Sequence, residues 1–419
     1  MKVLLINNCH WRRGGSEAVY FDTAELLVKA GCEVVFLSFD DRKNIHTNQP
    51  EYFVRHSNPI ISVIEYFTNK KAACIIEDVI KTEKPDIAHA HLLWGGMTAS
   101  IIPMLHKYGI PFVHTVHDYR MVCPAYTFRN ANGVVCEKCK GGMFWQCAKN
   151  RCSKGSLIQS IIMTLEMFYR NWKWHPANTI DGLVYVSNFA KQKHEEMDSR
   201  FSLTYNTVLY NFTTKGNEFP PVEKNSDYYL YYGRLSHEKG VSTLLNVFTK
   251  HPEVKLKIVG TGPLEKELKK KYSIQSTATD AKPGSYYENI QFLGYHSGGA
   301  LADLVRNARF VCVPSEWYEN NPMTIVEAYS MGVPVIGAKI GGIPEIVEEG
   351  RTGFLFESGN VESLEDSLSL SLALNDDDYV LMRKNAMHYA EEHFNSRSYV
   401  KRLVGFYEEV IKRFNSSNE

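Results

Sequence analysis

The sequence reads FVCVPSEWYENNPMTIVEAYSMGVP from Phe310 to Pro334. Its first four residues are apolar and are followed by a proline, a pattern that predicts a short buried strand. A polar loop comes next, and helix-forming residues then run from Pro322 to about Gly332. Asn320 or Asn321 is the expected cap of this helix, and Pro322 suits its first turn, where an amide hydrogen has no partner. The stretch therefore predicts a strand, a loop and a helix in succession.

The predicted helix start is suited to bind an anion. The backbone N–H groups of Met323, Thr324 and Ile325 are expected to be unpaired there, at the partly positive end of the helix dipole. Glu319 and Glu327 flank this start with the spacing E-x7-E, and a carboxylate beside a phosphate is repelled by it. These acids are instead suited to accept hydrogen bonds from sugar hydroxyls, so the pattern fits a nucleotide sugar. The alternative is an ordinary capped helix with two solvated glutamates.

A longer segment carries a resemblance to a known family. The family 4 retaining glycosyltransferases, which have the GT-B fold, carry a donor-site signature that resembles PSEWYENNPMTIVEAYSMGVPVIG and the later GGIPEIVEEGRTGFLF. The likeness runs from Val3 to the C-terminal helices, apart from a cysteine-bearing insertion. It implies two Rossmann-like domains that face a cleft. Bacterial capsular and surface polysaccharide transferases resemble this chain even at the start of the insertion, in HDYRMVCPAY and CEKC.

The composition is that of a globular protein. The chain has 419 residues, of which 44% are hydrophobic and 22% are charged, and this length suits two domains. The formal net charge is zero, which gives no electrostatic basis for binding nucleic acid. No apolar run approaches the roughly 20 residues that span a bilayer, and Met1–Ile6 is too short for a signal sequence. We therefore expect a cytoplasmic protein.

Strands alternate with helices along both halves of the chain, which predicts an α/β fold with parallel, doubly wound sheets. The first half carries predicted strands at Lys2–Asn7, Glu33–Phe39, Pro85–His91, Pro111–His117 and Asp181–Ser187, and Thr207–Asn211 is expected to end the first domain. The second half carries them at Tyr228–Gly233, Lys255–Gly260, Asn289–Gly294, Phe310–Val313 and Val333–Gly337. Residues 40–69 have no predicted element.

The predicted domains follow from this alternation and from a polar, proline-bearing break. They are an acceptor domain at 1–212 with the insertion at 121–174, a linker at 213–226, a donor domain at 227–395 and a C-terminal helix at 396–419. The resemblance implies that this last helix packs back onto the first domain.

A glycine pair follows the first strand. Gly14 and Gly15 precede a predicted helix together with Glu17, and glycine allows a ligand to approach the backbone closely. The pair is not part of a dinucleotide-binding GxGxxG motif, and a plain turn is the alternative. The resemblance implies that Gly14, Gly15 and Glu17 face the donor diphosphate and the acceptor.

His117 and Asp118 end another predicted strand of the first domain. A histidine at a strand end is commonly a hydrogen-bonded core residue. The resemblance implies that His117 contacts the transferred sugar and that Asp118 orients it or meets the acceptor. His114 lies an odd number of positions away, so its side chain points to the other face of the sheet, where a structural role is expected.

Two cations flank the loop that follows the first strand of the second domain. Arg234 and Lys239 lie in GRLSHEKG, where a helix also begins, so positive charge converges on one point and a diphosphate is the natural ligand. The spacing resembles the donor-diphosphate pair of family 4. The resemblance also places Gly233, Gly260 and Gly262 along the nucleotide pocket.

Five of the nine cysteines lie in the insertion, at Cys123, Cys136, Cys139, Cys147 and Cys152. The last four fit a structural zinc site, because they combine a C-x2-C pair with two further thiols. Disulfides and buried free thiols are the alternatives, and a cytoplasmic setting disfavours disulfides. The insertion is expected to shape the acceptor side.

Helical spacing and aromatic residues characterise the stretch from Leu157 to Trp174, which also carries Arg170 and Lys173. Such a helix can lie on a membrane surface with its apolar face among the lipid headgroups. Packing of that apolar face against the domain is the slightly favoured alternative.

The resemblance implies a retaining hexosyltransferase that needs no metal cofactor. Arg234 and Lys239, with Asn321, Pro322, Met323 and Thr324 at the helix start, would stabilise the departing nucleoside diphosphate. Glu327 would bind the ribose and Glu319 the transferred sugar. UDP is a commoner donor than GDP in resembling enzymes, and the acceptor would be a glycan or a lipid-linked sugar. An epimerase, a glycogen- or sucrose-type synthase and an inactive donor-binding scaffold are the rival hypotheses.

Overall fold

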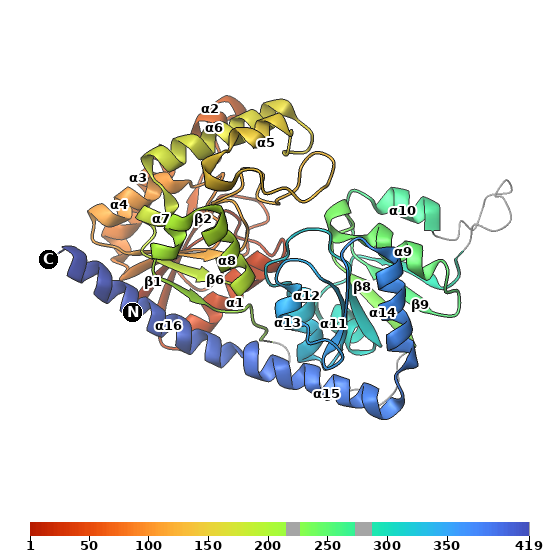
Figure 1. Ribbon diagram of the computed structural model, residues 1–419. Coiled ribbons are helices and arrows are strands. Elements are labelled where there is room, and N and C mark those ends of the chain that lie inside the picture. The colour runs from red at the N-terminus through yellow and green to blue at the C-terminus, as the bar shows by residue number, and fades with distance from the viewer. Residues whose placement is uncertain (215–226, 273–286, 419) are drawn as a thin grey trace. The chain divides into compact units, whose positions relative to one another are not determined.

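The structure is a computed structural model that describes residues 1–214, 227–272 and 287–418. Most of the predicted linker, from 215 to 226, lies outside these residues. The chain forms two compact units (Figure 1). Unit 1 comprises Met1–Tyr210 and Ser396–Glu419, and unit 2 comprises Asn211–Asn395.

Unit 1 is built on a seven-stranded sheet in which every neighbouring pair is parallel. Its strands are β1 (Lys2–Ile6), β2 (Glu33–Phe39), β3 (Glu51–Val54), β4 (Ile87–Ala90), β5 (Phe112–Val116), β6 (Gly182–Tyr185) and β7 (Asn206–Val208), in the order β3-β2-β1-β4-β5-β6-β7. Lys2 of β1 pairs with Glu33 of β2, and Val3 pairs with Ile87 of β4. The central strands are buried apolar runs, as parallel strands covered on both faces require.

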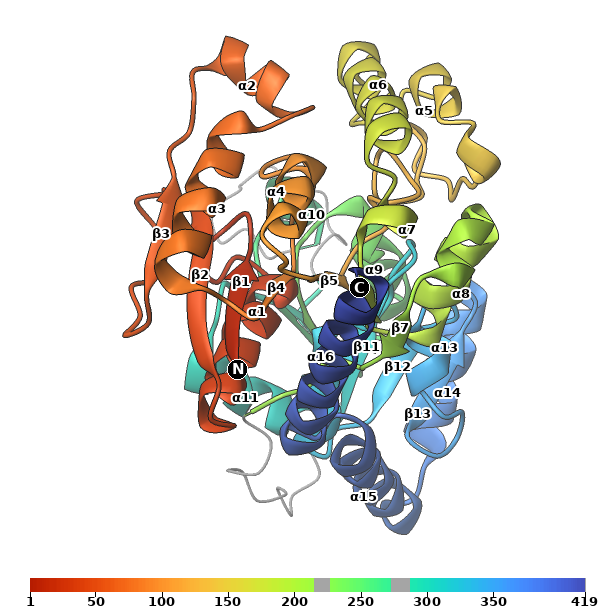
Figure 2. The ribbon, with the colours of Figure 1, turned by 90° about the vertical axis from the view of Figure 1, so that its left-hand side faces the viewer.

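The helices of unit 1 are α1 (Gly15–Lys29), α2 (Pro59–Glu65), α3 (Lys70–Glu83), α4 (Ile102–Lys107), α5 (Trp145–Lys149), α6 (Leu157–Lys173), α7 (Pro176–Thr179), α8 (Asn188–Met197) and α16 (Ser396–Asn418). Ser187 caps α8 as predicted, because its hydroxyl accepts a hydrogen bond from the Ala190 amide. The C-terminal helix α16 belongs to unit 1 (Figure 2). Its Tyr407 hydroxyl lies 2.6 Å from Nδ1 of His89 in β4, so the helix packs on this sheet.

Unit 2 is built on a six-stranded parallel sheet. Its strands are β8 (Tyr228–Tyr232), β9 (Lys255–Val259), β10 (Ile290–Gly294), β11 (Phe310–Val313), β12 (Val335–Ala338) and β13 (Gly353–Phe356), in the order β10-β9-β8-β11-β12-β13. Its helices are α9 (Val241–Phe248), α10 (Glu265–Tyr272), α11 (Gly298–Arg306), α12 (Met323–Ser330), α13 (Ile343–Ile346), α14 (Val361–Ala373) and α15 (Asp376–His393).

Each sheet has one point at which the strand order reverses. The order turns back between β1 and β4 in unit 1, and between β8 and β11 in unit 2. In doubly wound sheets, ligands bind outside the carboxyl ends of the strands at this point. The loops that follow β8 and β11 contain Arg234, Lys239 and Glu319 of the predicted donor residues.

The structure confirms the predicted α/β class with parallel sheets and adds elements that the pattern did not reveal. β3 and α2 lie in the stretch 40–69, for which no element was predicted, and β13 was also not predicted. Among the described residues, no helix combines the length and the apolar character needed to cross a membrane.

Candidate active site

The loops at the reversal point of unit 2 pack closely on each other. Gly240 ends the loop after β8 with a φ of +66°, and a Cβ at this position would overlap the carbonyl oxygen of Pro314, which follows β11. The Glu316 amide donates to the Glu238 carbonyl oxygen at 2.9 Å. Only glycine permits this approach, because it has no Cβ and adopts positive φ without strain. The two loops are therefore held against each other by their backbones.

An ion pair joins the same two loops through side chains that the sequence predicts for the site. Lys239 Nζ donates to Glu319 Oε1 at 2.6 Å, and the Ser315 hydroxyl donates to the same oxygen at 2.8 Å. The Glu319 side chain is buried, whereas that of Lys239 is about a quarter exposed. The predicted cation and the predicted sugar-binding acid are thus direct partners.

Glu319 is ionised in this surrounding. Burial alone would raise the pKa of its carboxyl group, but the charge of Lys239 and the hydrogen bonds to the carboxylate together lower this pKa below its ordinary value. A buried carboxylate with further lone pairs can accept hydrogen bonds from hydroxyl groups.

The start of α12 differs from the prediction in its cap. Pro322 itself is the N-cap and no side chain caps the helix, so Asn320 and Asn321 do not serve as caps. Asn321 instead contacts Asn211, whose amide donates to Asn321 Oδ1 at 2.9 Å and whose side chain donates to the Asn321 carbonyl oxygen at 2.7 Å. Geometry explains the difference, since this asparagine is held by a segment distant in the sequence.

One of the three predicted free amides at this helix start is in fact paired. The Ile325 amide donates to the Pro322 carbonyl oxygen at 3.0 Å, so the prediction was wrong for Ile325. Because no side chain caps α12, the amides of Met323 and Thr324 remain the donors suited to an anion.

Glu327 lies inside α12 and faces β8. The Tyr232 hydroxyl lies 3.2 Å from Glu327 Oε2 and 2.9 Å from the carbonyl oxygen of Thr324. Burial and the nearby carboxylate raise the pKa of Tyr232 well above its usual value, so the tyrosine stays protonated and donates. Tyr232 therefore fixes the orientation of the second predicted acid.

Arg234 and three glycines complete the predicted set in unit 2. Arg234 is exposed, next to Gly233, whose amide donates to the Val259 carbonyl oxygen at 3.0 Å. A Cβ at Gly260 would overlap the Gly233 carbonyl oxygen, and one at Gly262 would overlap that of Leu235. These glycines are thus required where the loops after β8 and β9 cross.

The sequence pattern did not identify Ser315, Tyr232 or Asn211 as neighbours of the site. Ser315 and Tyr232 are next to predicted elements, at the ends of β11 and β8. A polar residue at the end of a buried strand was the available signal, because sites of this fold gather at strand ends.

In unit 1, the predicted glycine loop forms the N-terminus of α1. Gly14 is the N-cap, Gly15 begins the helix, and both are exposed. Glu17 is buried in the first turn and accepts a hydrogen bond from the Ser16 hydroxyl at 3.1 Å. A Cβ at Gly14 would lie 3.5 Å from Glu17 Oε2. The loop therefore leaves backbone accessible beside a buried carboxylate.

His117 belongs to a group of histidines at the carboxyl ends of β4 and β5. Its Nε2 lies 2.9 Å from Nδ1 of His91, and the two rings stack with centroids 5.1 Å apart. Burial lowers the pKa of His117 to about 4, so the imidazole is neutral near pH 7. His114 is buried and Nδ1 of its ring lies 3.1 Å from the Ala90 carbonyl oxygen, which is a structural contact.

Asp118 connects the histidine group to the insertion. Its Oδ1 accepts a hydrogen bond from the Arg120 amide at 2.9 Å. The Arg120 guanidinium lies 3.3 Å from Glu166 of α6, and Arg170 lies 3.2 Å from the same carboxylate. These three charged side chains are almost fully buried. The sequence pattern did not reveal this network, and the available signal was Glu166, the one acid of the aromatic stretch Leu157–Trp174, four residues before Arg170.

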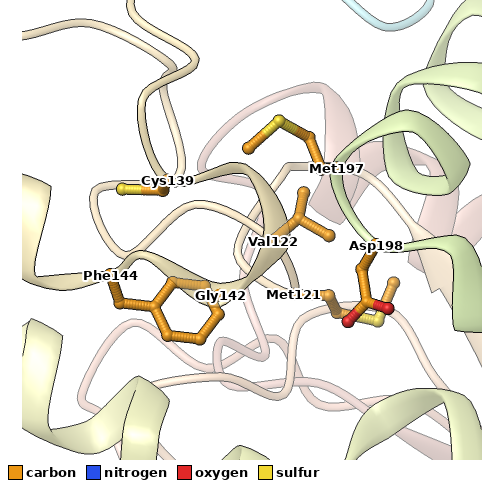
Figure 3. A pocket seen from close by; sticks show the side chains of 7 residues that line it. All are labelled: Met121, Val122, Cys139, Gly142, Phe144, Met197 and Asp198. Atoms are coloured by element: carbon orange, nitrogen blue, oxygen red, sulfur yellow. The ribbon is translucent and has the colours of Figure 1, made fainter.

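A small pocket lies in unit 1, between residues of the insertion and the C-terminal end of α8. Figure 3 shows the side chains around it. Its lining consists of Met121, Val122, Cys139, Gly142, Phe144, Met197 and Asp198. The lining is mostly apolar, and Cys139 is its single member among the predicted site residues.

The structure does not support the predicted zinc site at Cys136, Cys139, Cys147 and Cys152. Within the described part of the chain, no three His, Cys, Asp or Glu side chains are grouped so that they could hold a metal ion. All nine cysteines are free thiols in this structure. Cys152 forms a hydrogen bond with Cys147, and this contact lowers the pKa of Cys147. The thiols of Cys147 and Cys152 are thus hydrogen-bonded to each other.

Fold and site together define a GT-B glycosyltransferase. Residues 13–208 match the family described as "Glycosyltransferase Family 4", and residues 214–392 match "Glycosyl transferases group 1". The two matches divide the chain nearly as the two units do. The chain therefore belongs to the family 4 glycosyltransferases.

Similar proteins cover most of the chain. An uncharacterized 42.6 kDa protein in the cps region of Klebsiella pneumoniae is 25% identical over 367 residues, which cover 83% of this chain and 87% of that protein. The crystal structure of Anabaena Alr3699/HepE in complex with UDP has a TM-score of 0.67 at 17% identity and covers 98% of this chain and 100% of that one. Sucrose-phosphate synthase from Thermosynechococcus elongatus has a TM-score of 0.70 at 15% identity, with coverages of 98% and 99%. At these identities the two structures establish the fold alone.

Proposed function

We propose that this protein transfers a hexose, with retention of configuration, from a nucleotide sugar to a hydroxyl of a glycan or a lipid-linked acceptor. UDP is the favoured nucleotide over GDP, and no metal ion takes part. The observation that carries this proposal is the convergence of Lys239, Glu319 and the uncapped start of α12 at the reversal point of unit 2. Alr3699/HepE, which has the same fold, is known in complexes with UDP and with UDP-glucose.

The donor diphosphate is assigned to unit 2. Lys239 and Arg234 supply positive charge, and the Met323 and Thr324 amides supply hydrogen-bond donors. These groups stabilise the charge that grows on the leaving nucleoside diphosphate, so a divalent ion is not needed for that role. The carboxylate of Glu327 binds the ribose hydroxyls.

Glu319 is assigned to the hydroxyls of the transferred sugar. One of its oxygens is occupied by Lys239 and Ser315, which holds the carboxylate in place and leaves its other oxygen suited to the sugar. Retention is assigned to attack by the acceptor hydroxyl on the face from which the diphosphate leaves. A double displacement would instead need a carboxylate nucleophile on the opposite face.

The acceptor is assigned to unit 1, where His117, Asp118 and the loop Gly14–Glu17 lie at strand ends. A neutral His117 can accept or donate a hydrogen bond at a sugar hydroxyl. The likeness to a protein of the cps region supports a role in surface polysaccharide synthesis. We place the reaction in the cytoplasm, at the inner face of the membrane where a lipid-linked acceptor would be found.

Nucleotide binding tests the donor site. Thermal unfolding is followed with UDP, GDP, ADP and the corresponding nucleotide sugars, in the presence of a chelator. We expect one nucleotide to raise the unfolding temperature, and the Glu327→Ala variant to lose this rise. Asp366→Ala is the matched control, because Asp366 is an exposed acid on α14 of the same unit. The proposal fails if no nucleotide stabilises the protein or if both variants respond alike.

Product analysis then separates transfer from the rivals. An epimerase would convert the nucleotide sugar into an isomer and release no nucleoside diphosphate. An inactive scaffold would bind the nucleotide and leave it unchanged. A transferase releases the diphosphate in an acceptor-dependent way, and Glu319→Ala is expected to lower this release strongly.

A further inference from the structure

Helix α6 buries polar residues and exposes large apolar ones, the reverse of the usual arrangement of an amphipathic helix on a protein in water. Its buried residues are Ser160, Thr164, Glu166, Met167 and Arg170. Its exposed residues include the large apolar side chains Leu157, Ile158, Ile161, Leu165, Phe168 and Trp172. Ile158 is 72% exposed and Trp172 is 80% exposed. The slightly favoured prediction, that the apolar side of this helix packs on the domain, was therefore wrong.

The polar residues of α6 face inward because they have partners there. Glu166 pairs with Arg120 and with Arg170, and Arg170 also donates to the Arg120 carbonyl oxygen at 2.9 Å. Removing one of these partners would leave an uncompensated buried charge, which is strongly unfavourable. The network thus fixes the rotation of the helix about its axis. It also fixes the apolar side on the outside.

Helix α2 adds a second exposed apolar element at the same end of unit 1 (Figure 2). It has no buried residue, and its exposed aliphatic side chains are Ile60, Ile61, Val63 and Ile64. Phe67, just after α2, contacts Tyr169 of α6 with ring centroids 6.0 Å apart, so the two segments are in contact. We call the exposed apolar residues of α2 and α6 the α2–α6 face.

The exposed charges in the stretch that contains α6, Met143–Trp174, are all positive. Lys149, Arg151, Lys154 and Lys173 are exposed, and Lys173 Nζ lies 4.5 Å from the ring centroid of Trp174. Between Met143 and Trp174, Glu166 is the one acid in the sequence, and it is buried. A helix with a wide apolar side, interfacial tryptophan and flanking cations is suited to the headgroup region of an anionic bilayer.

We propose that the α2–α6 face rests on the surface of a membrane that contains anionic lipids. A second copy of the chain fits this face less well, because a two-fold contact would bring cations of the same sign together. The inference extends the lipid-linked acceptor of the proposed function. The test of this inference measures lipid binding alone, whereas the test of the donor site measures nucleotide binding. Either proposal can therefore fail without affecting the other.

Vesicle co-sedimentation of the full-length protein tests the proposal. Vesicles of phosphatidylglycerol and phosphatidylcholine are compared with vesicles of phosphatidylcholine alone. The wild-type protein is expected to bind the anionic vesicles and to be released by high salt. The double variant Ile158→Glu/Trp172→Glu is expected to bind at least about tenfold more weakly, because two charges enter the apolar side. Each charge reversal at Lys149 or Lys154 is expected to weaken binding by about fivefold or more.

The matched control is Leu203→Glu. Leu203 is 86% exposed in the short helix Ser199–Leu203 of the same unit, away from α2 and α6 in the sequence, and its variant is expected to bind as the wild type does. If the circular dichroism spectrum shows that the double variant is unfolded, the test is made with the charge reversals at Lys149 and Lys154 instead. The proposal is overturned if the wild type does not bind anionic vesicles, or if all variants bind equally. Self-association that the double variant abolishes, without lipid binding, would assign the face to a second copy.

Discussion

Replacing Lys239 by methionine tests the central contact of the candidate site. The variant keeps the length of the side chain and removes the ammonium group that lies 2.6 Å from Glu319 Oε1. Loss of one partner from a fully buried ion pair costs about 3–5 kcal/mol. Lys239 is 27% exposed and the Ser315 hydroxyl still donates, so we expect a smaller loss, about 2 kcal/mol at pH 7.

The loss is expected to depend on pH with a defined sign. In the wild type the pKa of Glu319 is lowered, so its stabilising effect is present above the unfolded pKa of about 4.3 and is lost as the pH falls through the folded pKa. Without Lys239, burial dominates and the pKa of Glu319 rises above its ordinary value. The buried charge then costs stability at neutral pH, and protonation removes this cost. The difference between wild type and variant therefore shrinks between about pH 7 and pH 4.

Urea unfolding of the full-length wild type and variant at several pH values measures this difference in unfolding free energy. Hydrogen exchange in β8 and β11 reports on unit 2 specifically. Lys250→Met is the matched control, because Lys250 pairs with Glu365 at 2.7 Å in the same unit, but the two side chains are 50% and 32% exposed. Its cost is expected to be below about 0.5 kcal/mol at every pH. Equal costs for the two variants would refute the argument. The argument would also be refuted if the difference in unfolding free energy between the wild type and Lys239→Met stayed constant as the pH falls.

Three further predictions concern the loops, the histidine and the metal. Gly240→Ala is expected to destabilise unit 2 by more than about 2 kcal/mol in urea unfolding, because its Cβ meets the Pro314 carbonyl oxygen. Gly298→Ala has a similar φ and open space, so its cost is limited to backbone strain, and equal costs would contradict the close packing. His117 has a pKa of about 4, so its ring protons in NMR are expected not to titrate between about pH 5 and 8, and a midpoint near 6.5 would contradict its burial. A chelator is expected to leave the rate of sugar transfer unchanged, and a loss restored by a divalent ion would contradict metal independence.

The central strands could be predicted from sequence because parallel strands covered on both faces are continuous apolar runs. β2 has the predicted bounds, Glu33–Phe39. The edge strand β3 was missed because EYFV is only partly buried and is not a continuous apolar run. β13 was missed because the pattern GFLF is short and follows a turn. Local apolar pattern thus predicts the middle of a sheet better than its edges.

The partners of the site residues could not be predicted, because they come from distant parts of the chain. Asn321 was expected to cap its own helix, yet it binds Asn211 instead. Lys239 and Glu319 were both predicted for the donor site, but their pairing across 80 positions has no local signal. Residue type and strand order therefore predict where a site lies, and not which side chains contact each other.

Helix α6 shows a further limit of sequence reasoning. Its periodicity correctly predicts an amphipathic helix, since period alone reports that two sides differ. Which side turns inward depends on Arg120, which precedes the helix by many residues and pairs with Glu166. An amphipathic helix usually turns its apolar side toward the protein interior. In α6 the buried ionic network turns the polar side inward instead, so the apolar side faces outward.

The same network links the two proposals. Asp118, assigned to the acceptor, accepts the Arg120 amide, and the Arg120 guanidinium pairs with Glu166 of α6. Arg120 therefore connects the proposed acceptor residue Asp118 to the helix that is proposed to rest on lipid. A lipid-linked sugar has its lipid in the bilayer and its sugar in water, so an enzyme acting on it must hold these two points at a fixed distance. A buried connection that includes the Arg120–Glu166 ion pair serves that purpose better than an apolar one, because a buried charge that loses its partner costs more than a displaced methyl group.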